Sequence, residues 1–275
     1  VEANNINIWY EEFGDKSNET ILLIMGANAN CMQWDQKFID RLVTNKFHVV
    51  RFDNRDVGKS TWFGREPTFN KFLKLLPNFL LRMIVNSVFG LAVDEKGRFK
   101  FSESSPTQYD LSDMAKDAVS LMDTLKIDKA HIIGASMGGM ITQIIALDYP
   151  ERVLSITPIM TSPGIQNDSL SGPTKELLEA MKKSFIFNLR GRIEDGVVEI
   201  YRQLTGSRFP FNEQEFREKL KPVITHGNNP FALHGAAVGA SQDRTPRLHE
   251  ITVPTLVIHG TEDAILPLDH GIAVA

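Results

Sequence analysis

Short apolar runs alternate along this chain with segments whose apolar residues recur at helical spacing. Strands are predicted at residues 5–13, 21–25, 47–52, 130–133, 154–160 and 253–259, and helices at 34–43, 110–125 and 137–149. The run at 21–25 is purely apolar, as expected of a central strand that is buried on both faces. Regular strand and helix alternation predicts an α/β fold, in which a mostly parallel sheet is flanked by helices.

Two stretches interrupt the alternation. Residues 64–107 contain an apolar helical segment at 72–93, where Lys74, Pro77 and Arg82 argue against a membrane span. Residues 164–245 are mostly helical in pattern and are expected to form a cap. The core is then predicted to comprise residues 1–63, 108–163 and 246–275. The 64–107 insertion either packs on its own domain or forms a lid or interfacial helix that covers an apolar substrate pocket. In the second case, residues 72–93 are expected to contact a membrane or lipid surface transiently.

A Gly134-x-Ser136-x-Gly138 motif joins the strand at 130–133 to the helix at 137–149. So short a turn is expected to hold Ser136 in a strained conformation with positive φ. Its hydroxyl would then lie at a helix N-terminus, where the dipole and free N–H groups favour developing negative charge. A simple N-cap serine is the alternative. The strand and helix context favours a nucleophile.

Two other glycine-rich patterns do not fit nucleotide binding. A dinucleotide fingerprint needs glycine where Ser136 stands, and a phosphate-binding loop ending at Gly58-Lys59-Ser60 needs glycine where Asp53 stands. We expect the polar turn at 53–60 to brace neighbouring loops.

Composition narrows the functional classes. The chain has 275 residues, of which 42% are hydrophobic and 23% charged, with a net charge of -4 and no concentrated basic stripe, so nucleic acid is not expected as a partner. Neither a metal nor an organic cofactor is expected, since paired-cysteine and His-x-x-x-His spacings are absent. Cys31 is the single cysteine and excludes an internal disulfide. Because the chain begins at Val1 rather than Met, both a cytoplasmic and a secreted location stay open.

Asp263 follows the last predicted strand. A carboxylate in a loop past the carboxyl end of a parallel strand points into the crevice where such sheets bind ligands, so Asp263 is a candidate acid of a triad. The alternatives are a loop carboxylate making an Asx-turn and, for His259, a residue that supports this loop. His226 and His234 in the cap are expected to be structural or to line a pocket.

These residues together resemble the α/β-hydrolase family, and within it small-molecule esterases of the aclacinomycin methylesterase type. The matching segments are 23–28, 51–60, 134–139 and 253–258 leading to Asp263. The resemblance implies Ser136 as nucleophile, Asp263 as the acid that orients a histidine, and the backbone N–H groups of Ala27 and Met137 as the oxyanion hole.

The chain departs from the family pattern at the catalytic base, which is a histidine in this family. The family order is Ser, then acid, then His after one more strand, but only twelve residues follow Asp263. His270 lies in a segment that resembles the helix before the last strand, and it is a poor candidate. We therefore expect the last strand, the last helix and the catalytic histidine to lie beyond Ala275.

The predicted function is that of a serine hydrolase, a carboxylesterase or lipase-like enzyme that cleaves esters with a hydrophobic portion through an acyl-enzyme. Its predicted partner is a small hydrophobic ester. Two alternatives stay open: a non-catalytic ligand-binding homologue, and a hydrolase of another bond such as an amide, a lactone or a carbon–carbon bond.

Overall fold

A computed structural model describes residues 1–100 and 107–275. Residues 101–106, part of the predicted 64–107 insertion, lie outside the described residues. The strands are β1 (Glu2–Ala3), β2 (Ile6–Asn7), β3 (Tyr10–Phe13), β4 (Thr20–Ile24), β5 (His48–Phe52), β6 (Ala130–Ala135) and β7 (Val153–Ile159). The 3-10 helices are η1 (Cys31–Gln33), η2 (Pro150–Arg152) and η3 (Thr245–Glu250). The α-helices are α1 (Gln36–Thr44), α2 (Thr68–Leu73), α3 (Asn78–Ala92), α4 (Leu111–Thr124), α5 (Met137–Asp148), α6 (Lys175–Leu189), α7 (Ile193–Leu204), α8 (Glu213–His226), α9 (His234–Ala240) and α10 (Leu268–Val274).

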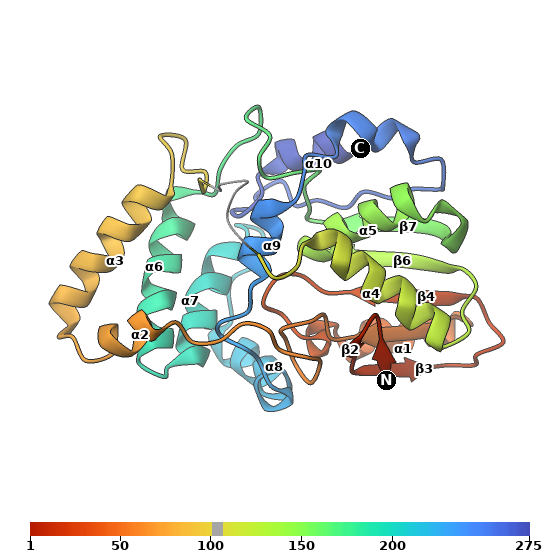
Figure 1. Ribbon diagram of the computed structural model, residues 1–275, viewed down its shortest axis with the longest axis horizontal. Coiled ribbons are helices and arrows are strands. Elements are labelled where there is room, and N and C mark those ends of the chain that lie inside the picture. Colours follow the sequence, from red (N-terminus) through yellow and green to blue (C-terminus); the bar gives the residue numbers. More distant parts are fainter. Residues whose placement is uncertain (101–106) are drawn as a thin grey trace.

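The main sheet is mostly parallel, as the alternation predicts. Within the described ranges it has five strands in the order β3-β5-β4-β6-β7, and only β3 runs antiparallel to its neighbour. Every residue of β4 is buried, which confirms the central strand predicted at 21–25. The α/β class is therefore confirmed, with helices on both faces of the sheet (Figure 1).

Alternate side chains of β4 belong to the two halves of the core. Leu22 and Ile24 pack in a cluster with residues of α4 and α5. Ile21 and Leu23 pack in a second cluster with Ile39 of α1. This two-sided burial explains why the strand sequences are continuous apolar runs rather than alternating ones.

Two predicted strands differ from their observed form. The strand expected at 5–13 is split into β2 and β3, and positive φ angles at Asn4 and Asn5 instead turn β1 back onto β2. The strand expected at 253–259 pairs in parallel with β7 through isolated bridges at Thr255 and Ile258.

The helices of residues 164–245, for which we keep the predicted name cap, lie beside the sheet (Figure 1). α6 and α7 pack on each other, α3 packs on the outer side of α6, and α8 contacts η1, which follows β4. Because η1 lies past the carboxyl end of β4, α8 approaches the edge of the sheet where the loops carry the candidate site. None of the described helices combines the length and apolar character needed to cross a bilayer.

Candidate active site

The turn between β6 and α5 holds Ser136 in an unusual backbone conformation. β6 ends at Ala135, α5 begins at Met137, and Ser136 between them has φ 54° and ψ −119°. The positive φ predicted from the motif is therefore confirmed. Such strain costs about 1–3 kcal/mol and persists only where the surroundings enforce it.

Two glycines allow α5 to pass this close to the sheet. A Cβ on Gly134 would lie 2.2 Å from the Gly138 carbonyl oxygen, and a Cβ on Gly138 would lie 2.1 Å from the Ile24 carbonyl oxygen. Side chains at these positions are excluded because the atoms they would meet are backbone. The close packing of helix against strands thus dictates both glycines of the motif.

The main chain of Ser136 is held on both sides. Its N–H donates to the Ile159 carbonyl at 2.8 Å, and its carbonyl accepts from the Thr161 hydroxyl at 2.7 Å. Ser136 is half-buried, and among the described residues no group hydrogen-bonds to its hydroxyl. The hydroxyl therefore makes no N-cap bond to α5, and the nucleophile role of Ser136 stays a prediction.

The loop after β4 lies against Ser136. A Cβ on Gly26 would come within 3.1 Å of the Ser136 Cβ and of the Ala135 carbonyl oxygen, so glycine at this position gives the serine side chain room. Asn28 N–H donates to Nδ1 of His234 at 2.8 Å, and the Asn228 side chain donates to the Asn28 carbonyl. These bonds fix the loop and leave the exposed Ala27, between Gly26 and Asn28, with its N–H unbonded within the described part of the chain.

Met137 is the first residue of α5, and the first N–H groups of a helix have no intrahelical partner. The two predicted oxyanion donors thus come from loops at the carboxyl ends of β4 and β6, which pair in register next to each other. Their role stays a prediction.

Asp263 lies in the loop after the residues that pair with β7. Its Oδ1 accepts from the N–H groups of Ile265 and Leu266, both at 2.9 Å, which is the loop-bracing geometry considered as the alternative to catalysis. Oδ2 lies 3.8 Å from His259 Nε2, which itself donates to the Leu266 carbonyl. One carboxylate oxygen is therefore committed to the loop, and the role of Asp263 as a triad acid stays a prediction.

None of the seven histidines, all within the described ranges, hydrogen-bonds to Ser136. His270 is buried in α10, where Nδ1 lies 2.9 Å from the Ser162 hydroxyl and Nε2 lies 2.8 Å from the Ser171 carbonyl oxygen. Both ring nitrogens are engaged with the protein, in agreement with the view that His270 is a poor candidate for the base.

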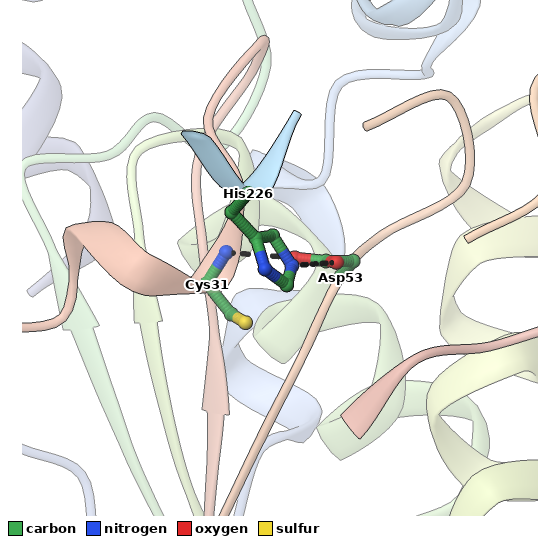
Figure 2. Close-up of side chains that lie close together, drawn as sticks. All are labelled: Cys31, Asp53 and His226. Carbon is green, nitrogen blue, oxygen red and sulfur yellow. Dashed lines mark hydrogen bonds and ion pairs between the residues drawn. The ribbon is translucent and has the colours of Figure 1, made fainter. Parts of the chain in front are cut away.

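A second cluster joins the cap to the core. Figure 2 shows His226, the last residue of α8, beside Asp53 and Cys31. The His226 ring donates from Nε2 to Asp53 Oδ2 at 2.6 Å, and Asp53 Oδ1 accepts from Cys31 N–H at 2.9 Å. The ligand atoms of the three buried residues lie within 4.8 Å of one another, a spacing that a metal ion could bridge.

The chemistry of this cluster argues for a structural role. Burial and the neighbouring Asp53 carboxylate raise the pKa of the Cys31 thiol, so the thiolate that a metal requires is disfavoured. Asp53 also accepts from Lys59 N–H, so both of its oxygens have protein donors. The cluster is complete without an ion and fastens α8 to the core.

Sequence reasoning assigned His226 and His234 only a general structural or pocket-lining role. The structure adds their hydrogen-bond partners. His226 pairs with Asp53, 173 residues earlier in the sequence, and His234 pairs with Asn28, 206 residues earlier. No local spacing connects positions that far apart. The one signal was the run of polar residues at 53–60, which predicted a bracing turn without naming what it braces.

The family described as alpha/beta hydrolase fold matches residues 19–275. Rhodomycin D methylesterase of Streptomyces sp. (strain C5) is 26% identical over 293 residues, which cover 98% of this chain and 84% of the relative. The 2-hydroxy-6-oxo-6-phenylhexa-2,4-dienoate hydrolase of Burkholderia cepacia is 33% identical over 166 residues, covering 58% of this chain and 54% of the relative. Among solved structures, the enol-lactonase from Burkholderia xenovorans LB400 superposes with a TM-score of 0.67 at 18% identity, covering 99% of this chain and 85% of that one.

Proposed function

This chain belongs to the α/β-hydrolase fold family and is a hydrolase of that type, and from this premise we propose that it is a serine esterase with Ser136 as nucleophile. One observation carries the proposal. Ser136 combines φ 54°, a half-buried hydroxyl without a hydrogen bond among the described residues, and a position at the N-terminus of α5. Backbone strain kept at a reactive side chain is expected where a nucleophile must stand clear of the sheet.

In the proposed reaction, the Ser136 Oγ attacks the ester carbonyl carbon while an imidazole takes its proton. The tetrahedral intermediate then collapses, the alcohol leaves with that proton, and the acyl group stays on Oγ. Water then attacks the acyl carbonyl carbon while the imidazole takes a proton from it; the bond to Oγ breaks, the imidazolium returns that proton to Oγ, and the carboxylic acid is released. The proposal requires this base but assigns it to none of the seven histidines of the chain.

The N–H groups of Ala27 and Met137 are the proposed donors to the oxyanion. Support comes from the loop of residues 26–30, because the next N–H along it, that of Asn28, is already bound by His234. Both donors are main chain, so no side-chain substitution removes one directly. Displacing the loop is the way to weaken them, and loss of one such donor costs about 10²–10³-fold in kcat.

An ester substrate is supported by the relative named rhodomycin D methylesterase, which the chain matches over 98% of its length. We propose a carboxylic ester with a hydrophobic portion. Asp263 is the proposed triad acid through its second oxygen, since Oδ1 is held by the loop. Replacement by asparagine is expected to lower kcat by up to about 10⁴-fold, because the base would lose its orientation.

The test is active-site labelling combined with ester hydrolysis. Wild-type protein is treated with a fluorophosphonate probe and the adduct is located by mass spectrometry, while p-nitrophenyl esters report turnover. Ser136→Ala should abolish labelling and lower kcat by about 10⁶-fold. Ser87→Ala, an exposed serine of α3, is the matched control and should change neither measurement. An adduct elsewhere, or unchanged turnover in Ser136→Ala, would refute the nucleophile.

A second candidate function rests on the absence of any hydrogen bond between Ser136 and the seven histidines, all within the described part of the chain. Without a base the same fold would bind a small hydrophobic ligand and not turn it over. Binding of a hydrophobic ester by calorimetry, with neither probe labelling nor product formation, would favour this candidate.

A further inference from the structure

The segment of α2 and α3 exposes large apolar side chains to an unusual extent. Eight of them between residues 69 and 91 are 36–81% exposed: Phe69, Phe72, Leu75, Phe79, Leu80, Met83, Val88 and Leu91. We call this set the α2–α3 surface. Single exposed apolar residues are normal, but a contiguous group of this kind marks an interaction site.

The two faces of α3 explain why this surface is not part of the core. Leu81 and Val85 point inward and join a small apolar cluster with Leu189 of α6. Leu80, Met83 and Leu91 lie at positions i, i+3 and i+11 of the helix and are exposed, away from the side that carries Leu81 and Val85. An ordinary surface helix carries charged residues there, whereas the outward side of α3 carries the apolar Phe79 and Met83 beside the exposed but uncharged Asn86 and Ser87.

The charge of the segment has one sign. Between Pro67 and Val93 the chain has Lys71, Lys74 and Arg82 but no aspartate or glutamate. A fourth cation, Arg190 at the end of α6, donates to the Lys74 and Leu76 carbonyls and so lies at the α2–α3 connection. A crevice between α3 and α6 adds Lys175 beside Phe89 and Val93, whereas Lys182 in the same crevice is paired with Glu179 at 2.5 Å. Lys74 is paired with Glu66 at 2.5 Å, so Lys71, Arg82 and Lys175 are the lysine and arginine side chains beside the apolar ones that form neither an ion pair nor a hydrogen bond among the described residues.

We propose that the α2–α3 surface binds in the plane of a lipid bilayer that contains anionic lipids. The apolar side chains enter the boundary between headgroups and acyl chains, and the cations pair with lipid phosphates. α3 has 15 residues and lies at the outer end of the molecule, far from the sheet, so a flat surface can reach it (Figure 1). The helix lies on the membrane and does not span it.

The charge pattern favours a bilayer over a second copy of the chain. A two-fold contact through this surface would place the same patch on both sides, so Lys71 and Arg82 of each copy would face a patch that has no aspartate or glutamate within residues 67–93. Like charges brought together in a contact are unfavourable. An anionic membrane supplies the opposite charge, and this argument does not depend on the esterase proposal.

Co-sedimentation of the purified protein with lipid vesicles tests the proposal. Vesicles of phosphatidylcholine with about 30% phosphatidylglycerol should bind the wild type more tightly than phosphatidylcholine alone, and about 0.5 M salt should reduce that preference. The variant Phe79→Ser/Met83→Ser/Leu91→Ser should lose at least about tenfold in affinity. Lys71→Gln/Arg82→Gln should lose most of the preference for anionic vesicles and keep part of the binding to both kinds.

The matched control is Ile193→Ser/Phe209→Ser/Ile224→Ser, which removes three exposed apolar side chains from other elements and should bind like wild type. Circular dichroism melting confirms that each variant is folded, as expected since the replaced side chains are exposed. The proposal is overturned if wild type fails to bind anionic vesicles, or if the Phe79/Met83/Leu91 variant binds them as wild type does. It is also overturned if wild type is a dimer that this variant dissociates while neither protein binds vesicles.

Discussion

At the scale of single residues, His234 fixes the loop that carries the proposed oxyanion donor. Its Nδ1 accepts from Asn28 N–H, and Nε2–H donates to the Arg55 carbonyl at 2.7 Å, so the ring is neutral with a defined tautomer. Burial lowers the pKa of His234 below its ordinary value of 6.5. Protonation would turn two N–H groups toward each other, and the loop would lose its acceptor.

The depressed pKa sets the sign of a pH effect. Because the unfolded chain binds a proton more readily than the folded one, the stabilisation is complete above pH 6.5 and is lost as pH falls from there toward the folded-state pKa. His234→Gln should lower the free energy of unfolding by about 1–3 kcal/mol near neutral pH. Urea titrations across this range should show that the difference in free energy of unfolding between wild type and His234→Gln becomes smaller at acid pH. A constant gap would contradict the assignment of the tautomer.

Sequence reasoning reached the residues whose neighbours are local and missed those whose partners are distant. The strand, turn and helix around Ser136 lie within twenty residues, so the motif predicted the positive φ that is observed. The Asn28 and His234 pair unites a loop of the core with the first residue of α9. No periodicity marks such a contact, because it depends on how the cap folds back.

At the scale of elements, the crossing of α5 over the sheet depends on Gly138. Gly138→Ala would place a methyl group 2.1 Å from the Ile24 carbonyl oxygen, and neither the helix nor β4 can move without disturbing the core. We expect a loss of about 3 kcal/mol in the free energy of unfolding, read from thermal or urea denaturation.

Gly90→Ala in α3 is the matched control, since a Cβ there meets nothing within 4 Å. Alanine is the better helix former, and this variant should gain about 0.5–1 kcal/mol. Equal stability of the two alanine variants would show that α5 tolerates displacement, and the tight-turn account of Ser136 would then fail.

Helices and strands that are buried in the core were predicted well, and strands at the edges of the sheet were predicted less well. β4, α4 and α5 were found within one or two residues of their predicted bounds, because they are buried and have a clear hydrophobic period. The strand expected at 253–259 forms only bridges to β7, with Leu256 and Ile258 exposed. Its apolar composition indicated a strand, but composition does not report how many neighbours a strand has.

At the scale of the whole molecule, the cap is attached to the core largely through buried polar groups. Asp53 accepts from His226 at the end of α8, and the side chain of Asn30 donates to the Val223 and Gly227 carbonyls. Asp56 is the most connected of these groups. Its oxygens accept from the N–H groups of Phe63, Gly64 and Leu233 and from the side chains of Tyr109 and Asn229.

These contacts make Asp56 a test of how the molecule is assembled. Burial alone would raise the pKa of its carboxyl, but the hydrogen bonds from Tyr109 and from three backbone N–H groups outweigh it and lower the pKa below 3.8. Its stabilisation is therefore present above pH 3.8 and lost as pH falls through that value toward the depressed folded-state pKa. Asp56→Asn keeps the shape and tolerates the φ of 69° at this position, but it presents an N–H₂ group where donors converge.

Asp56→Asn should therefore lower the free energy of unfolding by about 2–4 kcal/mol at about pH 7, since buried donors are left without an acceptor. The difference from wild type should shrink as pH falls below 3.8, where the carboxyl of the unfolded wild-type chain binds a proton before the folded one does. Limited proteolysis should then cut the variant first in residues 164–245, because the cap loses bonds from Leu233 and Asn229 while the sheet keeps its own. Cleavage spread evenly over cap and sheet would mean that Asp56 stabilises the molecule as one unit and does not hold the cap in particular.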